Sequence, residues 1–203
     1  MNEEYQRQFE RFNADVASHS VRVLREDGLY RHLRCSSGGY AYSFDIITWP
    51  GYLCYCGDMG SFVFTRLPDM FEFFRGRQTA LIDHGYLAEK AVAVDKPDGL
   101  RVFSEERFRE AVRSDFESFT EDWDAANRAV VWEDVEAEVL SYVDDGRNAA
   151  VGAAMEFRCD KREVFPDFWE HRLEEYTGRF WWCCYAIPWA IEKYDAQALE
   201  RAS

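Results

Sequence analysis

Cys54 and Cys56 lie two residues apart in a run of β-forming residues, and their thiols are candidates for a catalytic nucleophile. A thiolate is the nucleophile of cysteine enzymes, and a base such as His32, expected on a neighbouring strand, would activate it. Side chains alternate along a strand, so Cys-x-Cys places both thiols on one sheet face, where packing explains them equally well. The other cysteines and histidines have neither zinc-finger nor HExxH spacing; they are Cys35, Cys159, Cys183, Cys184, His19, His84 and His171. We expect the cysteines to serve mainly as small buried apolar residues.

A cluster of carboxylates, Glu133, Asp134, Glu136 and Glu138, could instead bind a divalent cation, because hard oxygen ligands suit magnesium. On a helix, however, this spacing spreads the four side chains over a wide arc and does not make them converge. The chain also has no glycine-rich phosphate loop. We therefore predict no catalytic residue, no metal site and no cofactor, and expect that the protein is not an enzyme.

Acidic residues are concentrated in one part of the chain. The formal net charge is −14, and residues 115 to 145 hold eleven acids against the single base Arg128. Such a surface repels nucleic acid and membrane headgroups and attracts basic proteins. It could imitate the phosphate array of DNA, or it could be a solvated helix face that keeps the protein soluble. The residues predicted to bind a partner are Glu121, Asp122, Asp124, Glu133, Asp134, Glu136, Glu138, Asp144 and Asp145.

Period-two patterns dominate the first half of the chain. The apolar spacing of residues 3–17 predicts an amphipathic helix, and two strands follow on either side of Asp27-Gly28. Three β-rich runs, separated by Trp49-Pro50-Gly51 and by residues 57–60, then predict an antiparallel meander. Pro68 and Asp69 look like the start of a short helix that Gly76 ends.

Beyond Gly99 the period changes to about 3.6, which predicts helices. Ser104 is the expected N-cap of the first one, and Phe108, Val112, Phe116 and Phe119 form its apolar stripe. The next helix has Trp132, Val135, Val139, Tyr142 and Val143 on one side, with the acids facing solvent. Gly146 is a predicted C-cap before a helix of small residues at 148–157. The last element runs from about Leu173 to Tyr194 and is apolar nearly all round between Phe180 and Ile191, which predicts either a buried helix bent at Pro188 or a strand followed by a helix.

Length and composition favour one compact α+β unit. The 203 residues are 47% hydrophobic and 17% aromatic, so the chain can bury a sizeable core. We predict an N-terminal antiparallel sheet of about four or five strands with flanking helices over residues 1–99, and an acidic helical part packed on it over 100–203. The polar start of the chain and the short apolar runs predict no signal peptide and no membrane anchor, hence a cytoplasmic protein.

The segment FDIITWPGYLCYCGDMGSFVFTRLPDMFEFFR is similar to a signature of uncharacterised proteins encoded in bacteriophages and prophages. The upstream FNADVASHSVRVLREDGLYRHLR belongs to the same pattern, so that the resemblance covers about the first third of the chain. No functional residue can be carried over, because no activity is assigned to the family as a whole. The resemblance implies a context in which small acidic phage proteins often act against host defence, including CRISPR and restriction systems, and several of them do so by occupying a nucleic-acid site.

Together these observations predict an inhibitor of the anti-CRISPR type, whose acidic helical face mimics DNA and binds a basic protein, such as a host nucleic-acid-binding defence complex. It would contact neither nucleic acid nor membrane directly. Two alternatives remain open from the sequence. One is a small enzyme acting on nucleic acid or nucleotide, centred on Cys54 and Cys56 or on the carboxylate cluster, and the other is a phage structural or assembly protein.

Overall fold

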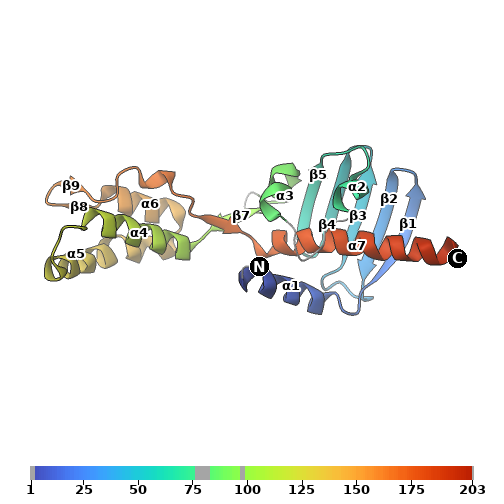
Figure 1. Cartoon of the computed structure of the whole chain (residues 1–203), viewed down its shortest axis with the longest axis horizontal. Coiled ribbons are helices and arrows are strands. Elements are labelled where there is room, and N and C mark those ends of the chain that lie inside the picture. Colours follow the sequence, from blue (N-terminus) through green and yellow to red (C-terminus); the bar gives the residue numbers. More distant parts are fainter. Residues whose placement is uncertain (1–2, 76–82, 97–98, 203) are drawn as a thin grey trace. The chain divides into compact units, whose positions relative to one another are not determined.

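The computed structural model describes residues 3–75, 83–96 and 99–202. By their contacts they divide into two compact units (Figure 1). The sheet unit consists of Met1–Leu100 and Tyr176–Ser203, and the insert consists of Arg101–Glu175.

The sheet unit contains one six-stranded antiparallel sheet in which the strands follow one another in chain order. The strands are β1 (Ser20–Asp27), β2 (Tyr30–Ser36), β3 (Phe44–Trp49), β4 (Tyr52–Gly57), β5 (Gly60–Thr65) and β6 (Ala91–Val94). The predicted meander is confirmed. Gly51 has φ +86°, a left-handed conformation that favours glycine, so Pro50-Gly51 makes the tight turn between β3 and β4.

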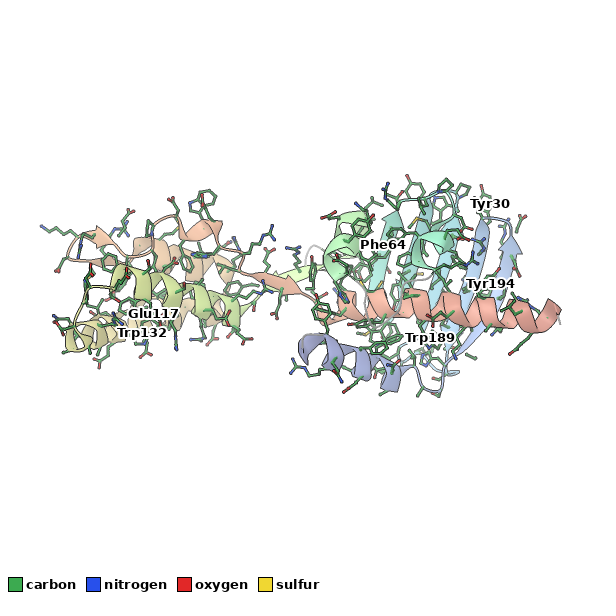
Figure 2. All side chains as sticks on the ribbon, viewed as in Figure 1. Tyr30, Phe64, Glu117, Trp132, Trp189 and Tyr194 are labelled. Carbon is green, nitrogen blue, oxygen red and sulfur yellow. The ribbon has the colours of Figure 1, made fainter. Side chains whose placement is uncertain are left out.

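Four helices of the sheet unit pack on one face of this sheet: α1 (Glu3–Asp15), α2 (Met70–Phe74), α3 (His84–Lys90) and α7 (Gly178–Ala202). Figure 1 shows α7 running across the strands with α1 beside it. Figure 2 shows Phe64 of the sheet and Trp189 and Tyr194 of α7 among the side chains of this unit. Between Phe180 and Ile191 nearly every side chain is buried, which explains why that run is apolar all round.

The apolar run Phe180–Ile191 lies wholly within α7, so it is a helix, and the short strand β10 (Glu174–Tyr176) precedes that helix. Pro188 lies inside α7. The predicted start of α2 is also confirmed, because the Asp69 side chain accepts a hydrogen bond from Phe71 N. The predicted end at Gly76 lies outside the described residues.

The insert is mainly helical and has its own apolar core. Its elements are β7 (Arg101–Phe103), α4 (Glu105–Phe119), α5 (Ala125–Glu138), the 3-10 helix η2 (Leu140–Asp145), α6 (Arg147–Glu156), β8 (Arg158–Cys159), β9 (Arg162–Glu163) and the 3-10 helix η3 (Phe168–Glu170). Ser104 caps α4 as predicted, its hydroxyl accepting a hydrogen bond from Arg107 N. Strand β7 pairs with β10, so the two ends of the insert lie side by side.

Three details differ from the sequence prediction. The sheet has six strands, because the short β6 adds to the edge of β5. Residues 176–203 belong with the sheet and not with the acidic helical part, so residues 100–203 are not one unit and the chain forms two compact units where one was expected. The apolar stripe after Val139 continues in a 3-10 helix, in which Val143 is buried but Tyr142 is exposed.

Candidate protein-binding surface of the insert

The acidic side chains lie on α4, on α5, in the turn that joins these two helices and in the 3-10 helix η2. Asp124 is the N-cap of α5, and its Oδ1 accepts hydrogen bonds from Ala126 N and Asn127 N, both at 3.0 Å. These bonds favour the carboxylate; the one from Asn127 N is the largest contribution, and together they hold the pKa of Asp124 below its usual value. Asp124 therefore has a structural role in addition to its charge.

Ten of the eleven acids between residues 115 and 145 are exposed, as the helical spacing predicted; Asp115 is the exception. Asp115 is half-buried, and its Oδ2 lies 2.8 Å from His171 Nε2. None of the ten exposed acids forms an ion pair with any residue in the ranges 3–75, 83–96 and 99–202. These ten carboxylates are thus available to an external cation.

Arg128, the single base among residues 115–145, does not neutralise the acidic side chains of this tract at the surface. Its Nη2 donates a hydrogen bond of 2.7 Å to Thr120 O, a carbonyl at the C-terminal end of α4. Its Nε is buried, and its side chain is only partly exposed. The guanidinium therefore joins α5 to the end of α4, where a cation is favourable beside the negative end of the helix dipole.

Packing of α5 divides its acids into two groups. Val135 and Val139 are fully buried against the core of the insert. Asp134 and Glu138, which are four residues apart, line a cleft beside the helix. Glu133 and Glu136 do not line this cleft, and Glu136 Oε1 accepts a hydrogen bond of 2.8 Å from Trp132 Nε1. The carboxylates do not converge on one point, and the described residues hold no group of three or more metal-ligating side chains.

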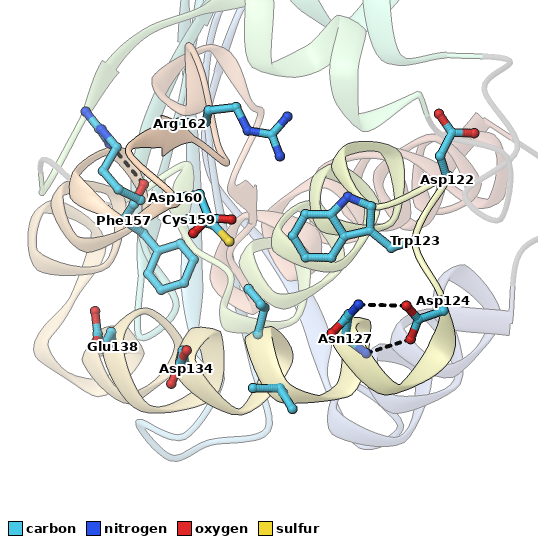
Figure 3. Close-up of a pocket in the computed structure, with 13 residues that line it drawn as sticks. Asp122, Trp123, Asp124, Asn127, Asp134, Glu138, Phe157, Cys159, Asp160 and Arg162 are labelled. Atoms are coloured by element: carbon cyan, nitrogen blue, oxygen red, sulfur yellow. Dashed lines mark hydrogen bonds between the residues drawn. The ribbon is translucent and has the colours of Figure 1, made fainter.

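The cleft has a volume of about 710 Å³ and lies between α5 and the β8–β9 hairpin. Figure 3 shows Asp134 and Glu138 on the helix, with Asp160 and Arg162 on the hairpin. Five acids and two arginines line it: Asp122, Asp124, Asp134, Glu138, Asp160, Arg158 and Arg162. Arg158 Nη2 is already paired with Glu163 Oε1 at 3.0 Å, and the Arg162 guanidinium lies 5.1 Å from the centre of the Phe119 ring. The cleft is therefore acidic overall.

Aromatic side chains provide the apolar part of the cleft. Trp123 and Phe157 line it together with Val130 and Val131, and Figure 3 shows the rings of Trp123 and Phe157 among the charged groups. Trp123 is half-buried, so part of its ring faces solvent. A cation above an indole ring is attracted by the negative π face, and nearby carboxylates add to this attraction. The cleft can thus accept an arginine or lysine side chain.

The structure brings together only part of the predicted surface. Asp122, Asp124, Asp134 and Glu138 meet in the cleft, whereas the other five lie outside its lining: Glu121, Glu133, Glu136, Asp144 and Asp145. The sequence prediction missed Asp160, which lies on the tip of the β8–β9 hairpin. Asp160 and Lys161 both have positive φ, 49° and 66°, and the polar Asp160-Lys161 pair between two short runs was a signal for this turn.

The alternative centre at Cys54 and Cys56 lies in the sheet unit. Both thiols lie on the sheet face opposite the helices and are half-buried, as Cys-x-Cys predicted. His32 is not on the strand next to β4 but two strands away, and its Nε2 lies 2.7 Å from Asp45 Oδ1 on the strand between them. The histidine is therefore directed to a carboxylate.

Fold and site together define an α+β protein in which an acidic helical insert interrupts the chain between a β-meander and its covering C-terminal helix. No protein-family model, curated protein or solved structure matches this chain. Among the described residues, no helix combines the length and the apolar character needed to cross a membrane.

Proposed function

We propose that the insert binds the basic surface of a nucleic-acid-binding protein and blocks it by occupying the place of the nucleic acid. The similarity of the first third to phage and prophage proteins favours a host defence complex, of the CRISPR or restriction type, as the target. Such an inhibitor acts by occupancy in the host cytoplasm, without catalysis and without a cofactor.

The observation that carries this proposal is the set of ten exposed carboxylates without an ion-pair partner among the described residues. Some carboxylates elsewhere in the same chain are neutralised within the fold: Asp69 and Asp195, for example, pair with Arg31 and Arg75. Long side chains lose entropy when they form a surface ion pair, so an array that stays unpaired keeps its full field for a partner.

The density of the acids on α5 is close to that of duplex DNA. Residues 133 to 138 hold four acids, and a helix rises about 1.5 Å per residue, so they provide about one charge per 2 Å. B-form DNA provides about one charge per 1.7 Å of its axis. A groove lined with Lys and Arg for a phosphate backbone therefore meets a comparable charge density on this helix.

The acidic cleft supplies a specific anchor in addition to this general attraction. An arginine of the partner could place its guanidinium between Asp134 and Glu138 and stack on Trp123. Charge pairs in a partly enclosed site of this kind are screened less by salt than pairs on an open surface.

Two matched triple variants test the proposal. The cleft variant carries Asp122→Lys, Asp134→Lys and Glu138→Lys, and the control variant carries Glu133→Lys, Asp144→Lys and Asp145→Lys. Both change the net charge equally, and all six positions are exposed, so both variants should keep the far-ultraviolet circular dichroism spectrum of the wild type. Asp124 is left intact because it caps α5.

Tagged wild-type protein and both variants are used to capture partners from host lysate at low salt. The proposal requires that the captured partner is a nucleic-acid-binding protein. High salt should release it because salt screens the charges, and duplex DNA should release it because DNA and the insert compete for the same basic groove. The cleft variant should lose this partner, and the control variant should retain more of it. Capture of the same partner by the folded cleft variant, undiminished, would contradict the proposal.

A further inference from the structure

The sheet face opposite the helices carries two neighbouring thiols whose surroundings differ from those of every other cysteine of the chain. Six cysteines are present, all as free thiols. Cys35, Cys183 and Cys184 are buried, and burial raises the pKa of each of these thiols. Burial also raises the pKa of Cys159 in the insert. At neutral pH these four thiols therefore keep their protons and are poor nucleophiles.

We propose that Cys56 and Cys54 form a redox-active dithiol, in which Cys56 attacks disulfides of small thiol compounds and Cys54 then closes an intrastrand disulfide.

Strand geometry brings the two sulfurs together. Both side chains point to the same face of β4, since they are two residues apart, and their Cα atoms are then about 6.4 to 6.8 Å apart. Disulfides span Cα separations of about 4.4 to 6.8 Å, so a Cys54–Cys56 bond is possible but close to the long limit. A bond at this limit is strained and hence easily reduced, which is what a reversible dithiol requires.

The neighbours of the pair assign the attacking role to Cys56. A hydrogen bond with Cys54 is the largest contribution that lowers the pKa of the Cys56 thiol to about 7, and His32 and Arg34 add to it, whereas burial and Asp45 oppose it. The same interaction, followed by burial, raises the pKa of Cys54, whose Sγ also lies 3.8 Å from Tyr55 O, so Cys54 keeps its proton. In the register Asp45 of β3 lies opposite Cys56 and Ser61 of β5 lies opposite it on the other side.

Asp45 is paired with the same two basic side chains, and its charge opposes theirs at Cys56. Its Oδ1 lies 2.7 Å from His32 Nε2, and its other oxygen accepts a hydrogen bond from Arg34. The thiolate of Cys56 therefore faces one carboxylate that is shared between two basic side chains. Among the described residues no group of three or more Cys, His, Asp and Glu side chains is arranged to hold a metal, so the pair lacks the further ligands of a four-coordinate zinc site.

The reaction balances as two thiol–disulfide exchanges. The Cys56 thiolate attacks one sulfur of a small disulfide, such as oxidised glutathione, forms a mixed disulfide and releases one thiolate, which takes a proton from water. Cys54 then loses its proton to solvent and attacks the Cys56 sulfur, which releases the second small thiol. The dithiol is oxidised by two electrons, and one small disulfide is reduced to two thiols.

Cys56 should react only modestly faster than an ordinary thiol. The identity of the cysteine that is modified is therefore a sharper test than the rate. At pH 7 a thiol with a pKa of about 7 is about half ionised, roughly fifteenfold more than an ordinary thiol. The thiolate of a less basic thiol is also a weaker nucleophile, so at neutral pH Cys56 should react only about threefold faster than an ordinary thiol. At lower pH the gain increases, because ordinary thiols are then almost entirely protonated.

The experiment treats the full-length protein with oxidised glutathione at pH 7 and measures intact mass after acid quenching. The wild type should lose two hydrogens and retain no glutathione, and peptide mapping should locate the bond between Cys54 and Cys56. Cys54→Ser should retain one glutathione on Cys56, since nothing resolves the mixed disulfide. Cys56→Ser should react at least about threefold more slowly. Cys159→Ser, the matched control at the remaining half-buried cysteine, should behave as the wild type.

A wild type that gains no Cys54–Cys56 disulfide would overturn the proposal, as would folded Cys54→Ser that carries no glutathione on Cys56. A second measurement does not depend on the variants: the pH profile of iodoacetamide alkylation at Cys56 in the wild type. Its midpoint should lie near 7, and a midpoint at or above that of an ordinary thiol, about 8.5, would overturn the assignment of Cys56.

Discussion

Replacement of residues 101–175 by a link of a few glycines should leave the sheet unit folded. The chain leaves and re-enters this unit at one place, where Thr177 N donates a hydrogen bond of 3.0 Å to Leu100 O and Thr177 Oγ1 donates one of 2.7 Å to Gly99 O. On the insert side Ser104 N donates a hydrogen bond of 2.8 Å to Leu173 O. Both ends of the excised segment are thus held together, and a short link can join them.

The expected magnitude follows from loop closure. An unfolded loop of about 75 residues costs about 3 kcal/mol more to close than one of about three residues. A folded insert holds its own ends together, so the sheet unit does not bear this cost. The free energy of unfolding of the sheet unit should therefore change by less than about 1 kcal/mol on excision. In the full-length protein, Val135→Asp should unfold the insert and destabilise the sheet unit by up to about 3 kcal/mol.

Urea unfolding followed by tryptophan fluorescence measures both effects. The sheet unit retains Trp49, Trp181, Trp182 and Trp189 after excision, so its transition stays visible. The excised protein should unfold in one cooperative step. Loss of that step, or a loss of stability above about 3 kcal/mol, would refute the reasoning that the insert is a self-contained unit.

Three further predictions concern single residues of the fold. Asp69→Ala should cost about 2 kcal/mol at pH 7, measured by urea unfolding, because it removes the cap of α2 and two hydrogen bonds from Arg31. Burial opposes ionisation of Asp69, but these bonds outweigh it and lower its pKa, so this cost should shrink as the pH falls from about 4 through the lowered pKa. Gly57→Ala should destabilise the protein by more than about 1 kcal/mol in thermal melts, since a Cβ there would lie 2.3 Å from Ser43 O. Gly152→Ala in α6, where a Cβ meets nothing, should instead raise stability by about 0.5 to 1 kcal/mol.

Local patterns were sufficient for most of the sheet. The turn residues Pro50 and Gly51 and the alternation along β3 to β5 predicted the meander, because one face is buried and one is not. Strand β6 was missed, since its four residues Ala91–Val94 form a strand only by pairing with Phe62, Val63 and Phe64 across a register shift. The sequence also could not assign α7 to a unit: its apolar run would suit any core, and only its contacts with the sheet and with α1 decide the matter.

The surface was predictable in composition but not in shape. Acids on a helix with Val135 and Val139 on its buried side must face solvent, and they do. The cleft requires a second wall, and the β8–β9 hairpin that forms it is held by Phe157 and Phe165, which are buried in the core of the insert. Their contacts with residues far along the chain leave no periodic signal. For the same reason the sequence prediction assigned nine acids to one binding face, whereas only four of these nine line the cleft.

The partition of charge between the two units argues that the acidic surface serves more than solubility. The insert holds 21 acidic and 10 basic residues, a net charge of −11, whereas the longer sheet unit holds 17 and 14, a net charge of −3. Solubility would be served by acids spread over both units. In the sheet unit, moreover, Arg31, Arg34 and Arg75 form ion pairs with carboxylates. In the acidic tract of the insert, by contrast, Arg128 donates a hydrogen bond to a backbone carbonyl. A net negative charge concentrated in one self-contained insert is the arrangement expected to attract a basic partner to a defined surface.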